Sequence, residues 1–329
     1  MTDQHRQSNP TPSIFHEPII PGILCNPASG RIKHHPQAIR QALKAITVNN
    51  YLEAVTSTEI RESIRRFSAS GINLLIMAGG DGTVHSALTH LFLLWRGELP
   101  AVAVIPCGTT NMTALDLGMR KKPLAGITLL RTGMARPGAL RYALRPVLCI
   151  DQGPLRRQFG MFFGCGLIPH GVKYFHNKVR QLGVTNEFAG GFVMLGYLCG
   201  LLLRPGSSPA VHLTLRGAGG DIEKQHCLVA FATTLDRLLL GIRPYRNLEK
   251  GSLFFTIIDN NMKSVWSAVI SLLAGNGGRA AGGNYGGNSD RLELLFDGDF
   301  IVDGELYHAQ RENGPVAISR TAPLRFLVL

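Results

Sequence analysis

Apolar runs of strand length alternate with amphipathic stretches of helix length through the first part of the chain. The strand-like runs lie at 19–24, 51–55, 72–77 and 101–105. The stretches with apolar residues at helical spacing lie at 35–46, 57–70, 83–95 and 122–130. Alternation of this kind is typical of βαβ units, so it predicts an open parallel sheet with helices on both faces.

The pattern changes from about Arg145, where short strand-like runs take over. Two helical stretches interrupt them, at 187–203 and 261–273. A series of short strands is typical of antiparallel sheets, so we predict a β-rich sandwich as the second domain. The glycine-rich stretch 275–288 has no helical pattern after it, which favours a plain loop over a phosphate-binding turn.

These changes divide the chain into four parts. We predict a flexible tail at 1–15, because this stretch is polar and contains prolines. An α/β domain follows at 16–142 and a β-rich domain at 143–320. Residues 321–329 form a final strand, for which a return to the first domain is left open.

Composition describes a compact protein and gives no sign of export. The chain has 329 residues, of which 45% are hydrophobic and 17% are charged. Its start lacks the basic and apolar regions of a secretory signal, and its longest apolar segment, 191–203, is too short to span a bilayer. Its six cysteines include no C-x-x-C pair, which favours reduced thiols. We therefore expect a cytoplasmic protein.

The formal net charge of +12 favours an anionic partner. The basic residues occur in short groups, without an arginine-rich helix or interleaved aromatic residues, so we expect no nucleic-acid partner. An anionic membrane surface, contacted peripherally at the inner face, agrees with the same charge. The sequence leaves a homodimer open.

A glycine-rich turn, MAGGDGTVHSAL at 77–88, follows an apolar run and precedes a helical pattern. Glycine can take positive φ and allows backbone N–H groups to approach a bulky anion. The start of the following helix adds unpaired donors and the positive end of its dipole. The stretch therefore predicts a phosphate-binding loop, although an ordinary strand-to-helix turn also uses glycine.

A second turn of this type, in AVAVIPCGTTNMTALDLGM at 101–119, follows the next strand-like run. Ligands of open α/β sheets bind at the carboxyl ends of the strands, so two such turns on neighbouring strands would line one cleft. The pair is much more specific than either turn alone.

In these motifs the chain resembles the diacylglycerol kinase catalytic-domain family of bacterial lipid kinases, which is related to sphingosine kinases and NAD kinases. The resemblance rests on four motifs in the order of the family: NPASG at 26–30, GGDGT at 79–83, PCGTTN at 106–111 and DGE at 303–305. They span nearly the whole chain. The fold implied is an NAD-kinase/diacylglycerol-kinase-like α/β domain that binds nucleotide, followed by a β-rich domain that binds the acceptor.

The resemblance also implies roles for individual residues. Asp81 would face magnesium or the phosphates of ATP, since a hard cation binds carboxylate oxygens. Glu305 matches the general base of the family, and Asp303 is assigned to the catalytic group with it. The nucleotide would be bound by Gly79, Gly80, Asp81, Gly82, Thr83, Gly108, Thr109, Asn26 and Thr56.

The chain also departs from the family pattern. His85 and Ser86 replace an Asn-Glu pair, and Met112 replaces an aspartate. Lys250 occupies the place of an acid linked to a structural magnesium ion. An ammonium there could take the hydrogen-bonding place of the ion, or could simply point into solvent.

Together these features predict a kinase that uses ATP and Mg²⁺ to phosphorylate a hydroxyl of a diacylglycerol-like or other lipid acceptor. An NAD kinase-like enzyme is one alternative, disfavoured by the motifs at 106–111 and 303–305. The departures at His85, Ser86 and Met112 keep a second alternative open, a catalytically weakened nucleotide-binding protein of the same fold.

Overall fold

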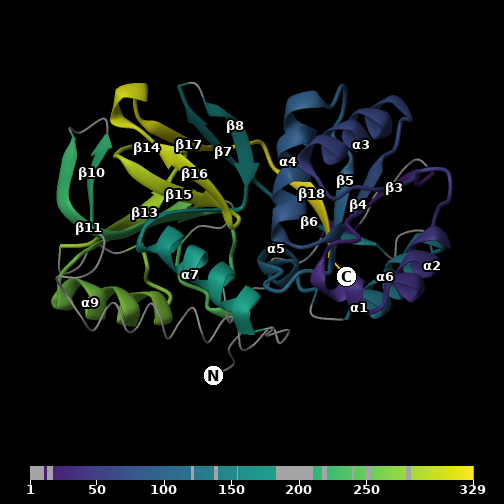
Figure 1. The fold of residues 1–329 in the computed structure, drawn as a ribbon, viewed down its shortest axis with the longest axis horizontal. Coiled ribbons are helices and arrows are strands. Elements are labelled where there is room, and N and C mark those ends of the chain that lie inside the picture. Colours follow the sequence, from purple (N-terminus) through teal and green to yellow (C-terminus); the bar gives the residue numbers. More distant parts are fainter. Residues whose placement is uncertain are drawn as a thin grey trace.

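The computed structural model describes most of the chain as two sheets with their helices (Figure 1). The described residues are 11–12, 18–119, 122–136, 140–153, 155–182, 210–216, 221–238, 241–248, 253–278 and 283–328. The expected tail at 1–15 lies almost wholly outside them, as do the expected helix at 187–203 and Lys250.

The first sheet has seven strands in the order β1-β6-β18-β5-β4-β2-β3. Their bounds are β1 (Thr11–Pro12), β2 (Pro21–Cys25), β3 (Tyr51–Glu53), β4 (Leu74–Gly79), β5 (Ala101–Pro106), β6 (Arg141–Arg145) and β18 (Leu324–Val328). Strands β3, β2, β4 and β5 pair in parallel. The last strand, β18, pairs in parallel with β5 and antiparallel with β6, so the end of the chain lies in the first sheet.

Helices cover both faces of this sheet (Figure 1). They are α1 (Gly30–His34), α2 (Pro36–Lys44), α3 (Ser57–Ala69), α4 (Asp81–Leu94), α5 (Met112–Asp116) and α6 (Pro123–Met134). Helices α3 and α4 pack together on one side, and α2 packs with α6 on the other. Every residue of β4 and β5 is buried, as the continuous apolar runs predict for central parallel strands.

The second domain is one curled antiparallel sheet of eleven strands. They are β7 (Leu148–Gln152), β8 (Leu155–Gly160), β9 (Phe162–Gly166), β10 (Val211–Arg216), β11 (Ile222–Thr233), β12 (Leu253–Asp259), β13 (Tyr285–Ser289), β14 (Arg291–Leu295), β15 (Gly298–Val302), β16 (Glu305–Ala309) and β17 (Val316–Arg320). A short 3₁₀ helix, η2 (Arg311–Asn313), follows β16. Buried side chains from both halves of the sheet form one core. The two layers expected of a sandwich are therefore parts of a single hydrogen-bonded sheet.

Two helices of the second domain are described, α7 (Leu167–Leu182) and α9 (Met262–Leu273). Helix α9 agrees with the expected stretch at 261–273, whereas α7 was not expected. The prediction of a plain loop at 275–288 was wrong at its end, because β13 begins at Tyr285 and pairs with β12. No helix in the described ranges combines the length and apolar character needed to cross a membrane.

The two domains meet where α4 packs against β8. The Thr89 hydroxyl accepts a hydrogen bond from the Phe159 amide at 2.9 Å, and the Phe92 and Phe159 rings stack with centroids 4.8 Å apart. On β6, the Arg145 guanidinium donates to the Asp236 carboxylate at 2.8 Å. Polar and aromatic contacts thus set the position of one domain against the other.

Candidate functional site

The two glycine-containing turns meet at the carboxyl ends of β4 and β5. The strands pair through Gly79 and Pro106, and the Cys107 amide donates to the Gly79 carbonyl at 2.9 Å. A Cβ added to Gly108 would lie 2.5 Å from the Gly80 Cα atom. The two turns therefore touch backbone to backbone, which only glycine permits.

Close approach, and not left-handed backbone, explains the glycines of the GGDGT loop. None of Gly79, Gly80 and Gly82 has a positive φ, so the expectation that they use that region was wrong. A Cβ on Gly79 would lie 2.5 Å from the Thr83 Cβ atom, since the helix starts immediately. Helix α4 has Gly80 as its N-cap and begins at Asp81, two residues before the predicted start.

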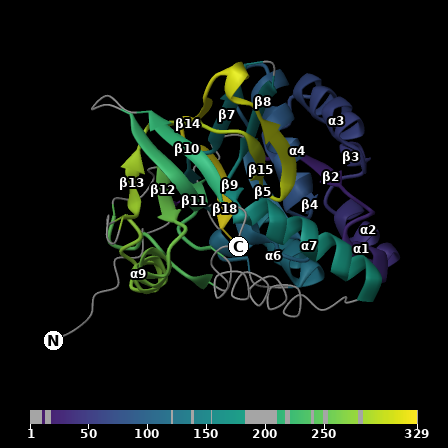
Figure 2. The same cartoon turned by 60° about the vertical axis from the view of Figure 1, so that its left-hand side comes forward.

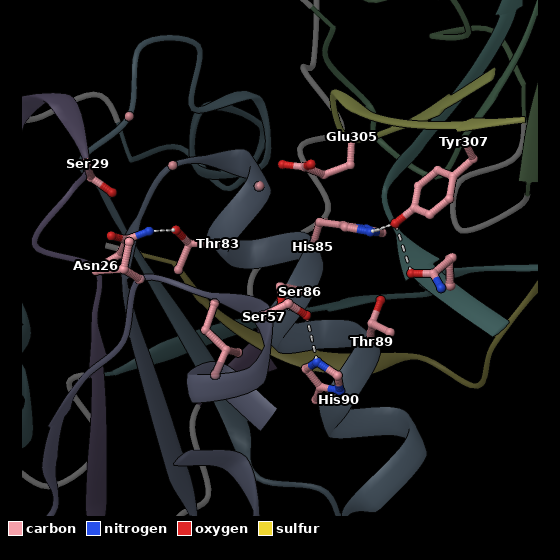
Figure 3. Close-up of a pocket in the computed structure, with 16 residues that line it drawn as sticks. Asn26, Ser29, Ser57, Thr83, His85, Ser86, Thr89, His90, Glu305 and Tyr307 are labelled. Carbon is pink, nitrogen blue, oxygen red and sulfur yellow. Dashed lines mark hydrogen bonds between the residues drawn. The ribbon is translucent and has the colours of Figure 1, made fainter. Parts of the chain in front are cut away.

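The turn after β2 is tied to this loop. The side-chain nitrogen of Asn26 donates to the Thr83 hydroxyl at 2.9 Å, and the side-chain oxygen of Asn26 accepts from the Ala28 amide at 2.9 Å. Asn26 thereby joins the NPASG turn to the first turn of α4. Figure 3 shows this contact at one end of the pocket.

Asn111 has a structural role in the second turn that the sequence analysis did not assign to it. It has a left-handed backbone with φ of 49°, which asparagine adopts more readily than most residues. Its side-chain oxygen accepts from the Gly108 amide at 2.8 Å, and its side-chain nitrogen donates to the Gly108 carbonyl at 2.5 Å. The last residue of the PCGTTN motif therefore fixes the glycine that contacts Gly80.

A pocket of about 590 Å³ lies between these loops and the second domain. Its lining is Asn26, Ser29, Val55, Ser57, Ile60, Gly80, Gly82, Thr83, His85, Ser86, Thr89, His90, Gly108, Gln158, Glu305 and Tyr307. Six of the predicted site residues belong to this lining: Asn26, Gly80, Gly82, Thr83, Gly108 and Glu305. The lining does not include the other five: Gly79, Asp81, Thr109, Thr56 and Asp303.

Asp81 lies in the first turn of α4 and joins the GGDGT loop to the start of α5. Its carboxylate accepts from the Met112 amide at 3.2 Å and from the Thr113 amide at 3.5 Å. Burial raises the pKa of Asp81 to about 6, although these amides oppose the shift. A carboxylate has about four lone-pair sites, so these two bonds leave it able to bind a cation or water.

Thr56 caps α3. Its hydroxyl accepts from the Glu59 amide at 3.2 Å, while the Glu59 carboxylate accepts from the Thr56 amide at 2.9 Å. This capping box gives a structural role to the hydroxyl that the resemblance assigns to nucleotide binding. The neighbours Val55 and Ser57 line the pocket in its place.

Glu305 enters the pocket from the second domain, at the start of β16. A Cβ on Gly82 would collide with the Glu305 carboxylate, so the absence of a side chain at Gly82 lets the two approach closely. Figure 3 shows the carboxylate directed at the first turn of α4. Two motifs more than 200 residues apart, GGDGT and DGE, are thus brought face to face.

His85 connects α4 to β16 and β8 through Tyr307. Its Nε2 atom lies 2.7 Å from the Tyr307 hydroxyl, which donates to the Gln158 side-chain oxygen at 3.0 Å. Because the hydroxyl has only one proton to donate, His85 must carry a proton on Nε2 and donate it to Tyr307. Burial lowers the pKa of His85 to about 4, so the ring is neutral at pH 7.

Asp303 anchors the turn that presents Glu305. It has a left-handed backbone with φ of 49°, and its carboxylate accepts from the Met161 amide at 3.0 Å and the Phe162 amide at 2.9 Å. Burial raises the pKa of Asp303 to about 8, and the carboxylates of Asp81 and Glu305 add to the increase. Asp303 is not among the residues that line the pocket, and its bonds to these amides fix the turn before Glu305.

A group of hydrogen-bonded polar side chains lines the pocket on α3 and α4. The Ser57 hydroxyl lies 3.0 Å from Nε2 of His90, and the Ser86 hydroxyl donates to Ser57 at 3.1 Å. Val55 and Ile60, which are close to Ser57 in the chain, also line the pocket. The lining thus combines the glycine-rich loops and Glu305 with a group of polar and apolar side chains from α3 and α4, and Figure 3 shows Ser57 and His90 of this group well apart from Asn26.

The assignment of Asp81 to magnesium binding has little support from neighbouring acids. Within the described ranges, no three histidine, cysteine or acidic side chains form a ready set of metal ligands. Magnesium usually binds through one or two carboxylates, water and substrate phosphates, so it does not need such a set. The remaining lone pairs of Asp81 fit that mode of binding.

Comparison with known proteins agrees with this arrangement. Residues 22–141 match the family model of the diacylglycerol kinase catalytic domain. The chain is 32% identical over 119 residues to the diacylglycerol kinase of Bacillus subtilis (strain 168), an alignment that covers 35% of this chain and 39% of that relative. The alignment thus spans well under half the length of the curated relative.

Solved structures extend the likeness over both domains. A candidate diacylglycerol kinase from Bacillus anthracis str. Sterne superposes with a TM-score of 0.66 at 16% identity, covering 94% of this chain and 96% of that one. A structure of a diacylglycerol kinase from the same strain superposes with a TM-score of 0.59 at 15% identity, with the same coverage. At these identities the comparison establishes the fold.

Proposed function

Because residues 22–141 match the family model of the diacylglycerol kinase catalytic domain, we propose that this protein is an ATP-dependent lipid kinase. It transfers the γ-phosphoryl group to a hydroxyl of a diacylglycerol-like or other lipid acceptor. The observation that carries the proposal is the position of Glu305, whose carboxylate faces Gly82 across the domain boundary. This position supports the proposal, because a base at Glu305 would then lie beside a phosphate-binding loop in the same pocket.

The glycine-rich loops that line the pocket suit a chain of phosphates. The amides of Asp81 and Gly82 lie in the first turn of α4, where a helix supplies no acceptors for its own N–H groups. The helix dipole adds positive potential there, and the contact between Gly80 and Gly108 leaves no side chain in the way. The part of the lining with Val55, Ser57 and Ile60 would then receive the rest of the nucleotide.

Glu305 can act as the general base. Its residue is solvent-exposed on an edge strand, and its carboxylate has no hydrogen-bond partner among the described residues, so the carboxylate can accept a proton. An acceptor hydroxyl bound between the domains would lose its proton to Glu305 as it attacks the γ-phosphorus. Phosphoryl transfer demands mainly positioning and charge neutralisation, which the two loops supply.

Magnesium, when bound with ATP, would neutralise phosphate charge. Asp81 is the carboxylate of the loop that would hold it, directly or through water, because two bonds to α5 amides already fix its orientation. Among the described residues that line the pocket, Glu305 is the only acid. We therefore expect the metal to arrive with the nucleotide and to have little affinity for the protein alone.

A transfer assay with γ-labelled ATP tests the proposal. Lipid, sphingoid and nucleotide acceptors are incubated with the protein and Mg²⁺, and the labelled product is separated by chromatography. Label in a diacylglycerol or another lipid supports the proposal, and label in NAD alone would replace it with the NAD kinase alternative.

The departures from the family pattern support a second candidate, a nucleotide-binding protein with weakened catalysis. His85 is neutral and its hydrogen bond is directed to Tyr307, and no acid stands at Ser86 or Met112. Such a protein would bind ATP with Mg²⁺ without measurable transfer to any acceptor. Titration calorimetry with ATP, run beside the transfer assay, separates the two candidates.

A further inference from the structure

Helix α9 presents an apolar stripe to solvent. Trp266, Ile270 and Leu273 are 54%, 65% and 62% exposed, and they follow each other at intervals of four and three residues. Met262 and Val269 are half-buried at positions of the same face. This spacing places all five on one side of the helix.

The opposite side of α9 holds it against the second domain. Ser264, Val265 and Ala268 are buried there, and the last two pack with Ile258 of β12. The Asn261 side chain caps the helix by accepting from the Ser264 amide at 2.8 Å. The stripe is therefore a surplus of apolar surface on a helix that is already anchored and capped.

The location of α9 leaves the stripe accessible. Figures 1 and 2 both show α9 at the outer edge of the second domain, away from α4 and the pocket. Exposed large apolar residues occur elsewhere in the described chain, such as Val48 and Leu144, but α9 is the one described element on which three of them share a face. Contiguous apolar surface of this kind marks an interaction site.

The surroundings of the stripe are basic. Lys263 is exposed beside it on α9. The loop before β12 brings Arg243 and Arg246 to the end of the helix, because the Gly277 amide donates to the Pro244 carbonyl at 2.8 Å. No aspartate or glutamate occurs in 241–248 or in 261–289.

We propose that α9 is a membrane-docking helix, which inserts its Trp266–Leu273 stripe into the interface of an anionic bilayer. An apolar face flanked by basic residues is the pattern of helices that lie in the plane of a membrane surface. Tryptophan favours the depth of the lipid headgroups, and each basic residue gains energy from anionic lipid. The proposal goes beyond the proposed function, because it assigns the contact with the membrane to a surface outside the pocket.

Charge argues for a membrane over a second copy of the chain. A two-fold contact through α9 would bring the same patch of each subunit together. Lys263, Arg243 and Arg246 of one copy would then face the same cations of the other, with no acid in these segments to offset them. An anionic bilayer matches both the apolar stripe and the charge around it.

Tryptophan fluorescence can test this directly. The chain has two tryptophans, so Trp95→Phe leaves Trp266 as the single reporter. We expect its emission to shift to the blue, and brominated lipid to quench it, with phosphatidylcholine vesicles that contain phosphatidylserine. Pure phosphatidylcholine should give a much weaker response, and added salt should weaken the anionic one.

A double variant of α9 and a matched control variant test whether the stripe itself binds the membrane. Ile270→Ser with Leu273→Ser should lower vesicle affinity about tenfold or more, since both side chains lose apolar burial in the bilayer. The matched control, Val48→Ser with Leu144→Ser, removes two exposed apolar side chains from the first domain and should bind like the parent.

Unchanged affinity in the α9 variant would overturn the proposal. A blue shift that depends on protein concentration without vesicles would also overturn it, in favour of self-association. None of these measurements needs turnover, so a failure of the kinase assignment would leave their outcome readable.

Discussion

The imidazole Nε2 atom of His85 lies 2.7 Å from the Tyr307 hydroxyl and joins the first turns of α4 to strand β16. Side chains two residues apart on a strand project from the same face, so Tyr307 and Glu305 share the side of β16 that faces the pocket. The bond from His85 therefore holds the strand that carries Glu305, the proposed base. A residue that departs from the family motif has become the contact that sets the position of Glu305.

Tyr307→Phe should lower turnover and leave nucleotide affinity nearly unchanged. The variant keeps the ring and removes the hydroxyl that joins His85 to Gln158. Loss of such a bond costs about 1 kcal/mol of stability, and slight displacement of Glu305 should reduce kcat roughly 10- to 100-fold. The measurement is kcat and KM for ATP, with thermal unfolding as a check on the fold. An increase in the KM for ATP at constant kcat would show that Tyr307 binds nucleotide and does not position the base.

Glu305→Gln should keep ATP binding and slow transfer by roughly 10²–10⁴, which is the usual contribution of a general base. The side chain remains almost the same size, so the contact with Gly82 is retained without a proton acceptor. Glu312→Gln provides the control, because Glu312 is an exposed acid of the same domain outside the pocket lining. Undiminished transfer in the Glu305 variant would show that another group takes the proton.

Asp81→Asn should change how nucleotide affinity depends on pH. The pKa of Asp81 is raised to about 6, so in the parent protein its negative charge is lost as the pH falls from 7 to 5. Affinity for ATP with Mg²⁺ should fall with it. The phosphates of ATP titrate in the same range, with a pKa of about 6 for a terminal phosphate.

The informative quantity is therefore the ratio of parent to variant affinity, measured by calorimetry at several pH values. We expect the ratio to be largest at pH 7 and to approach one near pH 5. A ratio that does not vary with pH would mean that the charge of Asp81 plays no part in binding.

Much of this fold could be predicted from local sequence. The central strands β4 and β5 are continuous apolar runs. Such runs are expected of a parallel strand with both faces buried, because both sets of side chains then pack in the core. The meeting of the GGDGT and PCGTTN turns follows from the same reasoning, since neighbouring parallel strands end at one edge of the sheet.

Other features depend on contacts between distant parts of the chain. The capping role of Thr56 is an exception, because Glu59 three residues later indicates it locally, whereas the resemblance to the family predicts nucleotide binding there. The contact of His85 with Tyr307 joins residues 222 positions apart, so no local pattern indicates it. The curvature that closes the second sheet on itself is likewise set by packing across the core.

Asp303→Asn should remove a pH dependence of stability. The folded pKa is raised to about 8 from an ordinary value of 3.8, so between these limits the folded protein holds a proton that the unfolded chain has lost. Stability of the parent should therefore fall as the pH rises from about 4 to 8, by at most about 1.4 kcal/mol per pH unit from this group. Asparagine does not ionise, and its single side-chain oxygen can still accept from both amides, as Asp303 Oδ1 accepts from Met161 at 3.1 Å and from Phe162 at 2.9 Å.

Urea unfolding at pH 5, 6, 7 and 8 measures the difference. We expect the variant to gain stability relative to the parent as the pH rises. A parent and variant with parallel pH profiles would show that Asp303 is ionised throughout this range in the folded state.

Alanine at two glycines of the site should separate binding from transfer. In Gly108→Ala the new methyl group would collide with the Gly80 backbone, so the two loops must move apart and the phosphate site between them is distorted. In Gly82→Ala it would meet the end of the Glu305 side chain, which can rotate away without moving the loop. The first variant should therefore bind ATP much more weakly, whereas the second should bind ATP and lose turnover, because its base has been displaced. Gly30→Ala is the control, since a Cβ there meets nothing within 4 Å. Calorimetry measures the ATP affinity of all three variants, and the transfer assay measures their turnover. Normal turnover in the Gly82 variant would contradict the placement of Glu305 over the first turn of α4.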